Sequence, residues 1–200
     1  MGRPQAFDHE QVLESAMQLF WKQGYATTSV KDLTNATQLQ PGSLYAAFKN
    51  KRNLFIQSLD HYFEALYEGV YQVLGSEEAP LVRIRQFFDY FLNLRKQDED
   101  MKSCLLVNTL LELPPEDEEI NQRVSEMFEQ IEQLFVTVLK EAQRNGSLAN
   151  GARPESIAKM LMSGIFGLQV YNRMQKDKDS LRQIVNNLLS ILEKPESEIR

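Results

Sequence analysis

Residues Ser29 to Lys51 read SVKDLTNATQLQPGSLYAAFKNK, and the interpretation of the whole chain starts from this stretch. Ser29 is followed three residues later by Asp32, a capping-box pattern that predicts the start of a helix. The pattern breaks at residues 37–39 and resumes at Gln40-Pro41, where the fixed φ and missing N–H of proline suit the first turn of a new helix. The sequence therefore predicts two short helices joined by a tight turn.

The second of these helices has two different faces. Leu44 and Phe48 are four residues apart and are expected to point inward together. The opposite face is small, polar and uncharged, and positive charge returns only after it, at Lys49, Lys51 and Arg52. A face that can approach base edges, flanked by cations that can hold phosphates, is what a helix-turn-helix DNA reader needs. A plain helical hairpin with solvated lysines fits the same pattern.

Helical patterns also surround this stretch. Asp8 is expected to cap a helix that stops at Gly24, and a longer helix is predicted from Lys51 to about Leu74. A Gly, Ser, Glu and Pro cluster then breaks the chain at residues 75–80. Further helices are predicted at residues 81–94, 104–113, 116–145, 154–174 and 180–192, with a polar break at 95–102 and a loop at 145–154. The fold class is therefore all-α, with about nine helices.

Composition excludes several classes of protein. The 200 residues are 42% hydrophobic, which is enough for a full core, and no apolar run approaches the roughly 20 residues that cross a bilayer. No signal-peptide pattern precedes Phe7, so we expect a cytoplasmic protein without a membrane partner. One cysteine and two distant histidines argue against a disulfide framework and against a metal site. Enzyme motifs such as HExxH or GxSxG are missing, and we expect no catalytic residues and no cofactor.

Charge is distributed unevenly along the chain. Of 22 basic and 28 acidic residues, 6 basic and 4 acidic ones lie in residues 1–58, so this segment carries a net charge of +2 and the remainder −8. A modestly basic head on an acidic body would orient the head toward phosphates. The asymmetry is weak evidence by itself, because charged runs usually mark solvated faces.

Residues Phe7 to about Asp60 resemble the N-terminal domain of the tetracycline-repressor (TetR) family of bacterial transcription regulators. The matching stretches are VLESAMQLFWKQGYATTSVKDL and QPGSLYAAFKNKRNLF, with PGSLY and FKNK as their most specific words. The resemblance implies a three-helix helix-turn-helix DNA-binding domain at residues 1–58 and a helical effector-binding and dimerisation domain at 59–200. It also implies a homodimer that binds double-stranded DNA at a palindromic operator and responds to a small-molecule effector.

The resemblance carries DNA-binding roles over to particular positions. Ser43 and Tyr45, with their neighbours on the same edge of the helix, would contact bases or phosphates. The nearby lysines and the Thr28 hydroxyl would bind the DNA backbone. The complete set is Thr28, Lys31, Gln40, Pro41, Gly42, Ser43, Tyr45, Ala46, Lys49 and Lys51. The family usually has glycine in the turn where this chain has Gln38, and a non-glycine residue at positive φ costs about 1 kcal/mol.

The last two predicted helices carry more apolar surface than one small body requires. Two such helices could bury the surplus against a symmetry mate, and glycine would permit close helix approach. Ordinary core within one chain is the alternative, and the resemblance favours a four-helix dimer interface. The interface candidates are Leu161, Gly164, Leu168, Tyr171, Val185, Leu188 and Leu192.

Cys104 offers one sharper hypothesis about the effector. It is expected near the start of a short helix, where backbone amides favour a thiolate. The string CLLVNT resembles the branch of the family that contains the N-ethylmaleimide-responsive repressor, in which a cysteine at this place senses electrophiles or oxidants. The alternative is a buried, inert cysteine that packs as a small hydrophobe.

Two other classes of function were weighed against a DNA-binding regulator. One is an enzyme, and the other is a helical adaptor protein whose residues 29–51 meet no DNA. Binding to a palindromic duplex with strong salt dependence would separate the regulator from both. Repression is the commoner action in the family, but the residues do not separate it from activation. They also do not identify the effector, the operator or the regulated genes.

Overall fold

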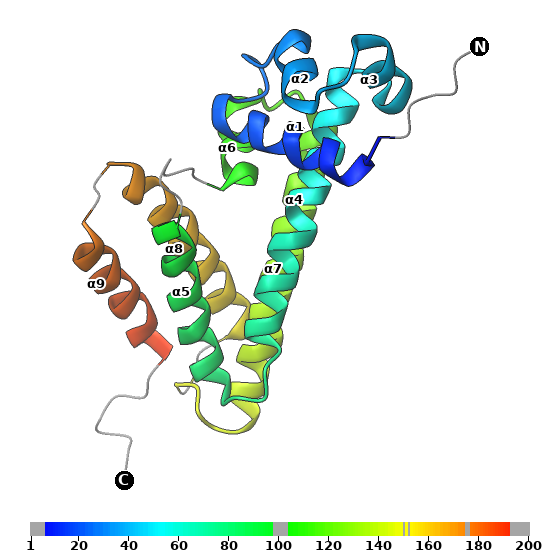
Figure 1. The fold of residues 1–200 in the computed structure, drawn as a ribbon. Helices are drawn as coiled ribbons and strands as arrows, with labels where there is room; N and C mark the ends of the chain where they lie inside the picture. Colours follow the sequence, from blue (N-terminus) through cyan, green and yellow to red (C-terminus); the bar gives the residue numbers. More distant parts are fainter. Residues whose placement is uncertain (1–6, 98–103, 150, 152, 175–176, 193–200) are drawn as a thin grey trace. The chain divides into compact units, whose positions relative to one another are not determined.

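The computed structural model describes residues 7–97, 104–149, 151, 153–174 and 177–192, and all regular secondary structure in these ranges is helical (Figure 1). The helices in chain order are α1 His9–Gln23, α2 Val30–Thr37, α3 Pro41–Phe48, α4 Lys51–Leu74, α5 Pro80–Gln97, α6 Leu105–Glu112, α7 Glu118–Arg144, α8 Pro154–Met174 and α9 Lys178–Leu189, followed by a 3-10 turn at Ser190–Leu192. The all-α prediction is confirmed, and the described helices agree in number with the sequence pattern.

The described residues pack as two compact units. The first contains those up to Leu66 together with Cys104–Val124, and the second contains those of Tyr67–Ser103 and Ser125–Arg200. The first unit therefore takes in α6 and the start of α7 as well as the helix-turn-helix segment. The division of functions at residue 58 stays a prediction.

Aromatic rings build the core of the first unit. Phe20 of α1 meets Phe55 of α4 edge to face, with ring centroids 4.9 Å apart. The ring of Tyr25, in the turn after α1, lies 4.6 Å from that of Phe55. Phe48 of α3 is 1% exposed. Burying side chains of this size contributes about 1.5–3 kcal/mol each, so these rings fix α1, α3 and α4 against one another.

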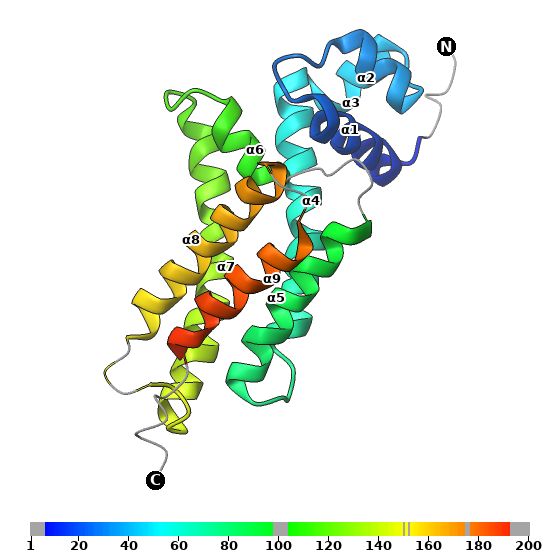
Figure 2. The same ribbon diagram turned by 90° about the vertical axis from the view of Figure 1, so that its left-hand side faces the viewer.

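The second unit has a core of the same kind around α5 and α7. Phe87 lies edge to face with Phe88 and with Phe135, at centroid distances of 5.4 and 4.9 Å. Arg83 of α5 is also buried, and its guanidinium donates to the Leu74 carbonyl at 3.1 Å and forms an ion pair with Glu141. A buried arginine needs such partners, since an unpaired buried charge is costly. Figure 2 shows α5, α8 and α9 of this unit side by side.

Several helix limits differ from the prediction by one to three residues, and two of these differences have a local cause. Helix α5 extends to Gln97, three residues beyond Leu94, because arginine, lysine and glutamine favour helix even where the apolar pattern has ended. Helix α9 begins at Lys178 instead of Ser180, because the carboxylate of Asp177 accepts from the Asp179 amide at 3.1 Å and caps it. The rest of the predicted break, at residues 98–102, lies outside the described residues, as do residues 1–6 and 193–200.

Candidate nucleic-acid interface

The first helix of the predicted pair begins with the expected cap. The Asp32 amide donates to the Ser29 hydroxyl at 3.1 Å, and the Ser29 amide donates to the Asp32 carboxylate at 2.9 Å. The bonds from Ser29 hold the pKa of the Asp32 carboxyl below its usual value. This confirmed capping box satisfies the free amides at the helix start and fixes where α2 begins.

The turn between α2 and α3 uses the non-glycine residue noted in the sequence. Gln38 has φ 58° and ψ 20°, the left-handed conformation, and its side-chain amide donates to the Asn35 carbonyl at 2.5 Å. Helix α3 then starts with Pro41 in its first turn, as predicted. The strain of about 1 kcal/mol is offset by this local bond, so the turn forms without glycine.

Helix α3 separates an inner from an outer face, as predicted. Leu44 and Phe48 are 3% and 1% exposed. The outer face consists of exposed positions, and Tyr45 is exposed to 44%. A Cβ added to Gly42 would meet no atom within 4 Å. We refer to this surface as the reading face, and its members are Gln40, Pro41, Gly42, Ser43, Tyr45 and Ala46.

The chain leaves α3 through a second strained residue. Lys49 has φ 65° and ψ −53°, and the Asn50 amide donates across it to the Phe48 carbonyl at 2.7 Å, which is a γ-turn. The Asn50 side chain then accepts from the Asn53 amide at 2.8 Å, in the manner of a cap at the start of α4. As a result the exposed Lys49 side chain follows directly on the reading face.

Two of the residues predicted to contact DNA are engaged within the protein in this structure. Lys51 points inward, where its Nζ donates to the carbonyls of Tyr25 and Thr28 at 2.7 and 2.8 Å and lies 4.4 Å from the centroid of the Tyr25 ring. Thr28 is 1% exposed, and its hydroxyl donates to the Gly24 carbonyl at 2.5 Å. Both side chains therefore hold the turn after α1. Lys31 and Lys49 are exposed, and their contact with DNA stays a prediction.

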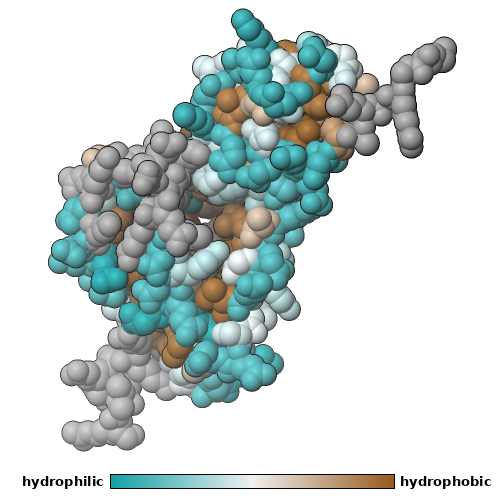
Figure 3. Space-filling model, viewed as in Figure 1, coloured by the Kyte–Doolittle hydropathy of each residue, from teal (hydrophilic) through white to brown (hydrophobic). Residues whose placement is uncertain are grey.

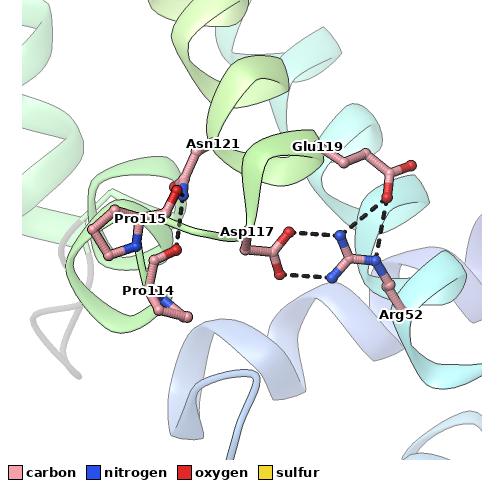
Figure 4. A network of polar contacts seen from close by, with 6 residues as sticks. All are labelled: Arg52, Pro114, Pro115, Asp117, Glu119 and Asn121. Atoms are coloured by element: carbon pink, nitrogen blue, oxygen red, sulfur yellow. Dashed lines mark hydrogen bonds and ion pairs between the residues drawn. The ribbon is translucent and has the colours of Figure 1, made fainter.

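Arg52 is also engaged within the first unit, as Figure 4 shows. Its guanidinium donates to both carboxylate oxygens of Asp117 at 2.6 and 2.5 Å, and to Glu119 at 3.0 and 3.2 Å. These bonds hold the pKa of the Asp117 carboxyl below its usual value and raise the pKa of Arg52. Burial raises the pKa of the neighbouring Tyr25 hydroxyl. Of Lys49, Lys51 and Arg52, Lys49 is therefore the one whose side chain lies exposed, while the other two are partly buried.

Cys104 lies where its sequence predicted, immediately before α6, but its thiol makes no capping bond. It is 6% exposed, and the Tyr62 hydroxyl donates to its Sγ at 3.5 Å. Burial restricts access of a reagent to the sulfur, so the sensor hypothesis and the inert alternative both stay open.

The dimer-interface candidates are divided by burial. Leu161, Leu168, Val185 and Leu192 are no more than 4% exposed within this single chain, so these four pack inside it. Gly164 faces Leu188 so closely that an added Cβ would collide with it, which means that this glycine serves packing between α8 and α9 of the same chain. Gly164, Tyr171 and Leu188 are partly exposed.

The exposed apolar side chains of α8 form a different stripe. Met160, Val170 and Met174 are 39%, 47% and 75% exposed, and they are accompanied by the exposed small residues Ser163 and Gly167. Spacings of three and four residues place all five on one face of the helix. We refer to this surface as the α8 stripe. Of the residues of α8 that the sequence suggested for an interface, Leu161 and Leu168 fill the chain's own core, while Gly164 and Tyr171 are partly exposed.

Other kinds of site are not found in the described residues. They contain no group of three histidine, cysteine, aspartate or glutamate side chains placed to hold a metal ion. No described helix combines the length and apolar character that crossing a bilayer requires. Hydrophilic side chains cover most of the face drawn in Figure 3, with smaller hydrophobic areas between them.

Comparison with known families identifies both parts of the chain. Residues 12–57 match the family model "Bacterial regulatory proteins, tetR family", and residues 80–188 match "Tetracyclin repressor-like, C-terminal domain". The chain belongs to the TetR family. It is accordingly a DNA-binding transcriptional regulator and not an enzyme.

Individual relatives of this TetR family member span nearly its whole length. It is 28% identical over 193 residues to the transcriptional repressor ComR of Escherichia coli K12, covering 95% of this chain and 91% of ComR. A cysteine mutant of the TetR family regulator CifR, solved with 26 bp double-strand operator DNA, superposes with a TM-score of 0.84 at 29% identity, covering 94% and 98% of the two chains. The reduced form of NemR from Escherichia coli superposes with a TM-score of 0.83 at 20% identity, covering 94% and 97%, and shares the fold.

Proposed function

We propose that this TetR family regulator is a repressor that binds a palindromic operator through the reading face of α3. The observation that supports this is an exposed, uncharged face beside the exposed Lys49, on a helix whose other side is locked into the core by Leu44 and Phe48. Small side chains let the helix approach base edges, while Lys31 and Lys49 supply charge for phosphates. The operator complex of CifR and the repressor name of ComR agree with this proposal.

Specific base recognition is expected to be limited. Gly42 and Ala46 offer no polar side chain, and only Gln40, Ser43 and Tyr45 on the reading face can donate or accept a hydrogen bond. Specificity should therefore rest partly on contacts with thymine methyl groups and on DNA shape.

The proposed active form is a homodimer that uses the α8 stripe. Exposed methionine and valine side chains favour association with an apolar surface, and Gly167 leaves open space for a close approach, since an added Cβ there would meet nothing within 4 Å. Two reading faces related by a two-fold axis would contact half-sites separated by about one helical turn, near 34 Å. The operator would then be palindromic. Chromosomal DNA as the partner makes the cytoplasm the expected location.

A small-molecule effector is expected to release the operator. By linkage, the operator must then weaken effector binding by the same factor. Cys104 is the candidate for a reactive trigger, and it can be tested by treating wild type and Cys104→Ser with a quinone or hypochlorite. Release of DNA by the wild type alone supports the trigger, whereas equal release by both proteins excludes it.

Binding to duplex DNA tests the proposal directly. A duplex from the upstream region of the protein's own gene should bind on the order of 10³-fold more tightly than a scrambled duplex, and affinity should fall steeply with salt. Equal affinity for both duplexes would exclude a specific operator there. A protein that stays monomeric at the concentrations where it binds would contradict the dimeric form.

A further inference from the structure

The last residue of α6 contacts the turn between α1 and α2. The two carboxylate oxygens of Glu112 accept hydrogen bonds from the backbone amides of Tyr25 and Ala26, at 3.0 and 2.7 Å. The partners are 87 and 86 residues apart in the chain, and all of them belong to the first unit. One carboxylate on two successive amides is a charge-assisted arrangement that holds a turn in a single geometry.

Gly24 makes this contact sterically possible. It has φ 86°, and a Cβ placed there would lie 2.9 Å from both carboxylate oxygens of Glu112. Any side chain at this position would therefore meet the carboxylate as well as an unfavourable backbone conformation. The glycine that ends α1 thus also leaves room for Glu112.

A residue of α4, Lys51, also makes hydrogen bonds to this turn. The Lys51 ammonium donates to the carbonyls of Tyr25 and Thr28, while the Glu112 carboxylate accepts from the amides of Tyr25 and Ala26. Donors and acceptors of one short segment are thus bound by opposite charges from two helices. Ser29, which caps α2, follows immediately, so the geometry of this turn sets where α2 begins and, through it, how α3 is presented.

We propose that Glu112 is a positioning residue for DNA reading, acting through the turn at Gly24–Thr28. This rests on the proposed function of the reading face. Without the Glu112 carboxylate the turn can adopt more conformations. Specific binding to DNA then costs the free energy of ordering the turn. Contacts with phosphates tolerate small displacements, so specific binding depends on the turn more strongly than non-specific binding does.

The test compares three variants with the wild type. Glu112→Ala removes the contact, Glu112→Gln keeps one acceptor oxygen and loses the charge, and Glu116→Gln removes the same charge from an exposed position in the same unit. Affinities are measured at one salt concentration for a duplex selected from a random pool by the wild type and for a scrambled duplex. Hydrogen exchange of residues 24–28 is followed in the DNA-free proteins.

Glu112→Ala is expected to bind the selected duplex about fivefold more weakly than Glu116→Gln, which is the effect of one hydrogen bond of about 1 kcal/mol. Glu112→Gln should fall between them, and affinity for the scrambled duplex should be alike in both Glu112 variants and Glu116→Gln. Exchange at residues 24–28 should accelerate most in Glu112→Ala, less in Glu112→Gln and not in Glu116→Gln.

Two outcomes would overturn the proposal. One is unchanged exchange in Glu112→Ala, which would mean that the contact does not hold the turn. The other is an equal loss for both duplexes, or no loss, which would mean that Glu112 does not position the reading face. A wild type that selects no duplex contradicts the proposed function instead, while the exchange measurement still tests the contact.

Discussion

The reading face and the α8 stripe are both exposed, but they differ in chemistry and in support. The reading face has small or polar side chains around Gly42 and is backed by the buried Leu44 and Phe48. The α8 stripe presents Met160, Val170 and Met174 above a core of the chain's own leucines. A surface that excludes charge but stays polar suits a partner that brings phosphates and base edges, whereas flexible apolar side chains suit another apolar surface. The two faces therefore indicate two different partners.

The largest effect on binding is expected for a variant that repels the DNA phosphates directly. Gly42→Glu places a carboxylate on the reading face without steric conflict, because a Cβ there meets nothing within 4 Å. Repulsion from phosphates should lower operator affinity on the order of 100-fold in a binding titration. Gly42→Ala is the control and should bind close to wild type. If Gly42→Glu binds the operator as tightly as the wild type, the reading face does not contact the DNA.

A second variant tests the α8 stripe in the same way. Val170→Glu buries a charge if the stripe is an interface, and should raise the dimer dissociation constant at least about tenfold in analytical ultracentrifugation. Thr137→Glu adds the same charge at an exposed position of α7 and should leave the dimer intact. If the two variants associate equally well, the interface lies elsewhere.

Gly24 and Gly146 both have positive φ, and a comparison of the two tests how tightly Glu112 packs against the turn after α1. Gly24 faces the Glu112 carboxylate, whereas Gly146, at φ 74°, has nothing within 4 Å of an added Cβ. Gly24→Ala should lower the free energy of unfolding by about 1–3 kcal/mol and Gly146→Ala by about 1 kcal/mol, measured by thermal denaturation. Equal losses of unfolding free energy in the two variants would show that the Glu112 carboxylate moves away from the added Cβ at no cost in stability.

A smaller effect is expected for the ion pair of Arg52 and Asp117, because Arg52 is 37% exposed. The folded-state pKa of Asp117 is lowered, so its stabilisation is present above the unfolded pKa of about 3.9 and is lost as pH falls through the lowered value. Asp117→Asn should cost no more than about 1 kcal/mol near neutral pH, and the difference from wild type should vanish in acid. Urea unfolding at several pH values measures it.

Glu155, whose pKa is lowered first by its bond to Lys140, offers a more exposed comparison, since its side chain is 57% exposed and that of Asp117 is 15% exposed. Near neutral pH, Glu155→Gln should change stability less than Asp117→Asn, because both side chains of its ion pair are exposed. A larger effect of Glu155→Gln would show that exposure does not decide how much each of these two ion pairs contributes to stability.

The sequence by itself determined the local structure of this protein. Caps at Asp8 and Ser29, the proline at 41, the apolar pair Leu44 and Phe48, and the limits of α4 and α8 could all be predicted, because each depends on residues a few positions apart. The same residues carried the resemblance that the family models confirmed.

Only the tertiary structure decided which charges face solvent and which apolar residues face the core. Lys51 and Arg52 read as phosphate contacts in sequence, but carbonyls from the preceding turn and carboxylates more than 60 residues away engage them. The role of Glu112 left no local signal for the same reason. Leu161 and Val170 are both apolar residues of one helix, and only packing against α9 and the rest of the unit places the first inside and the second outside. Contacts between distant parts of the chain depend on the fold as a whole, and no local pattern records them.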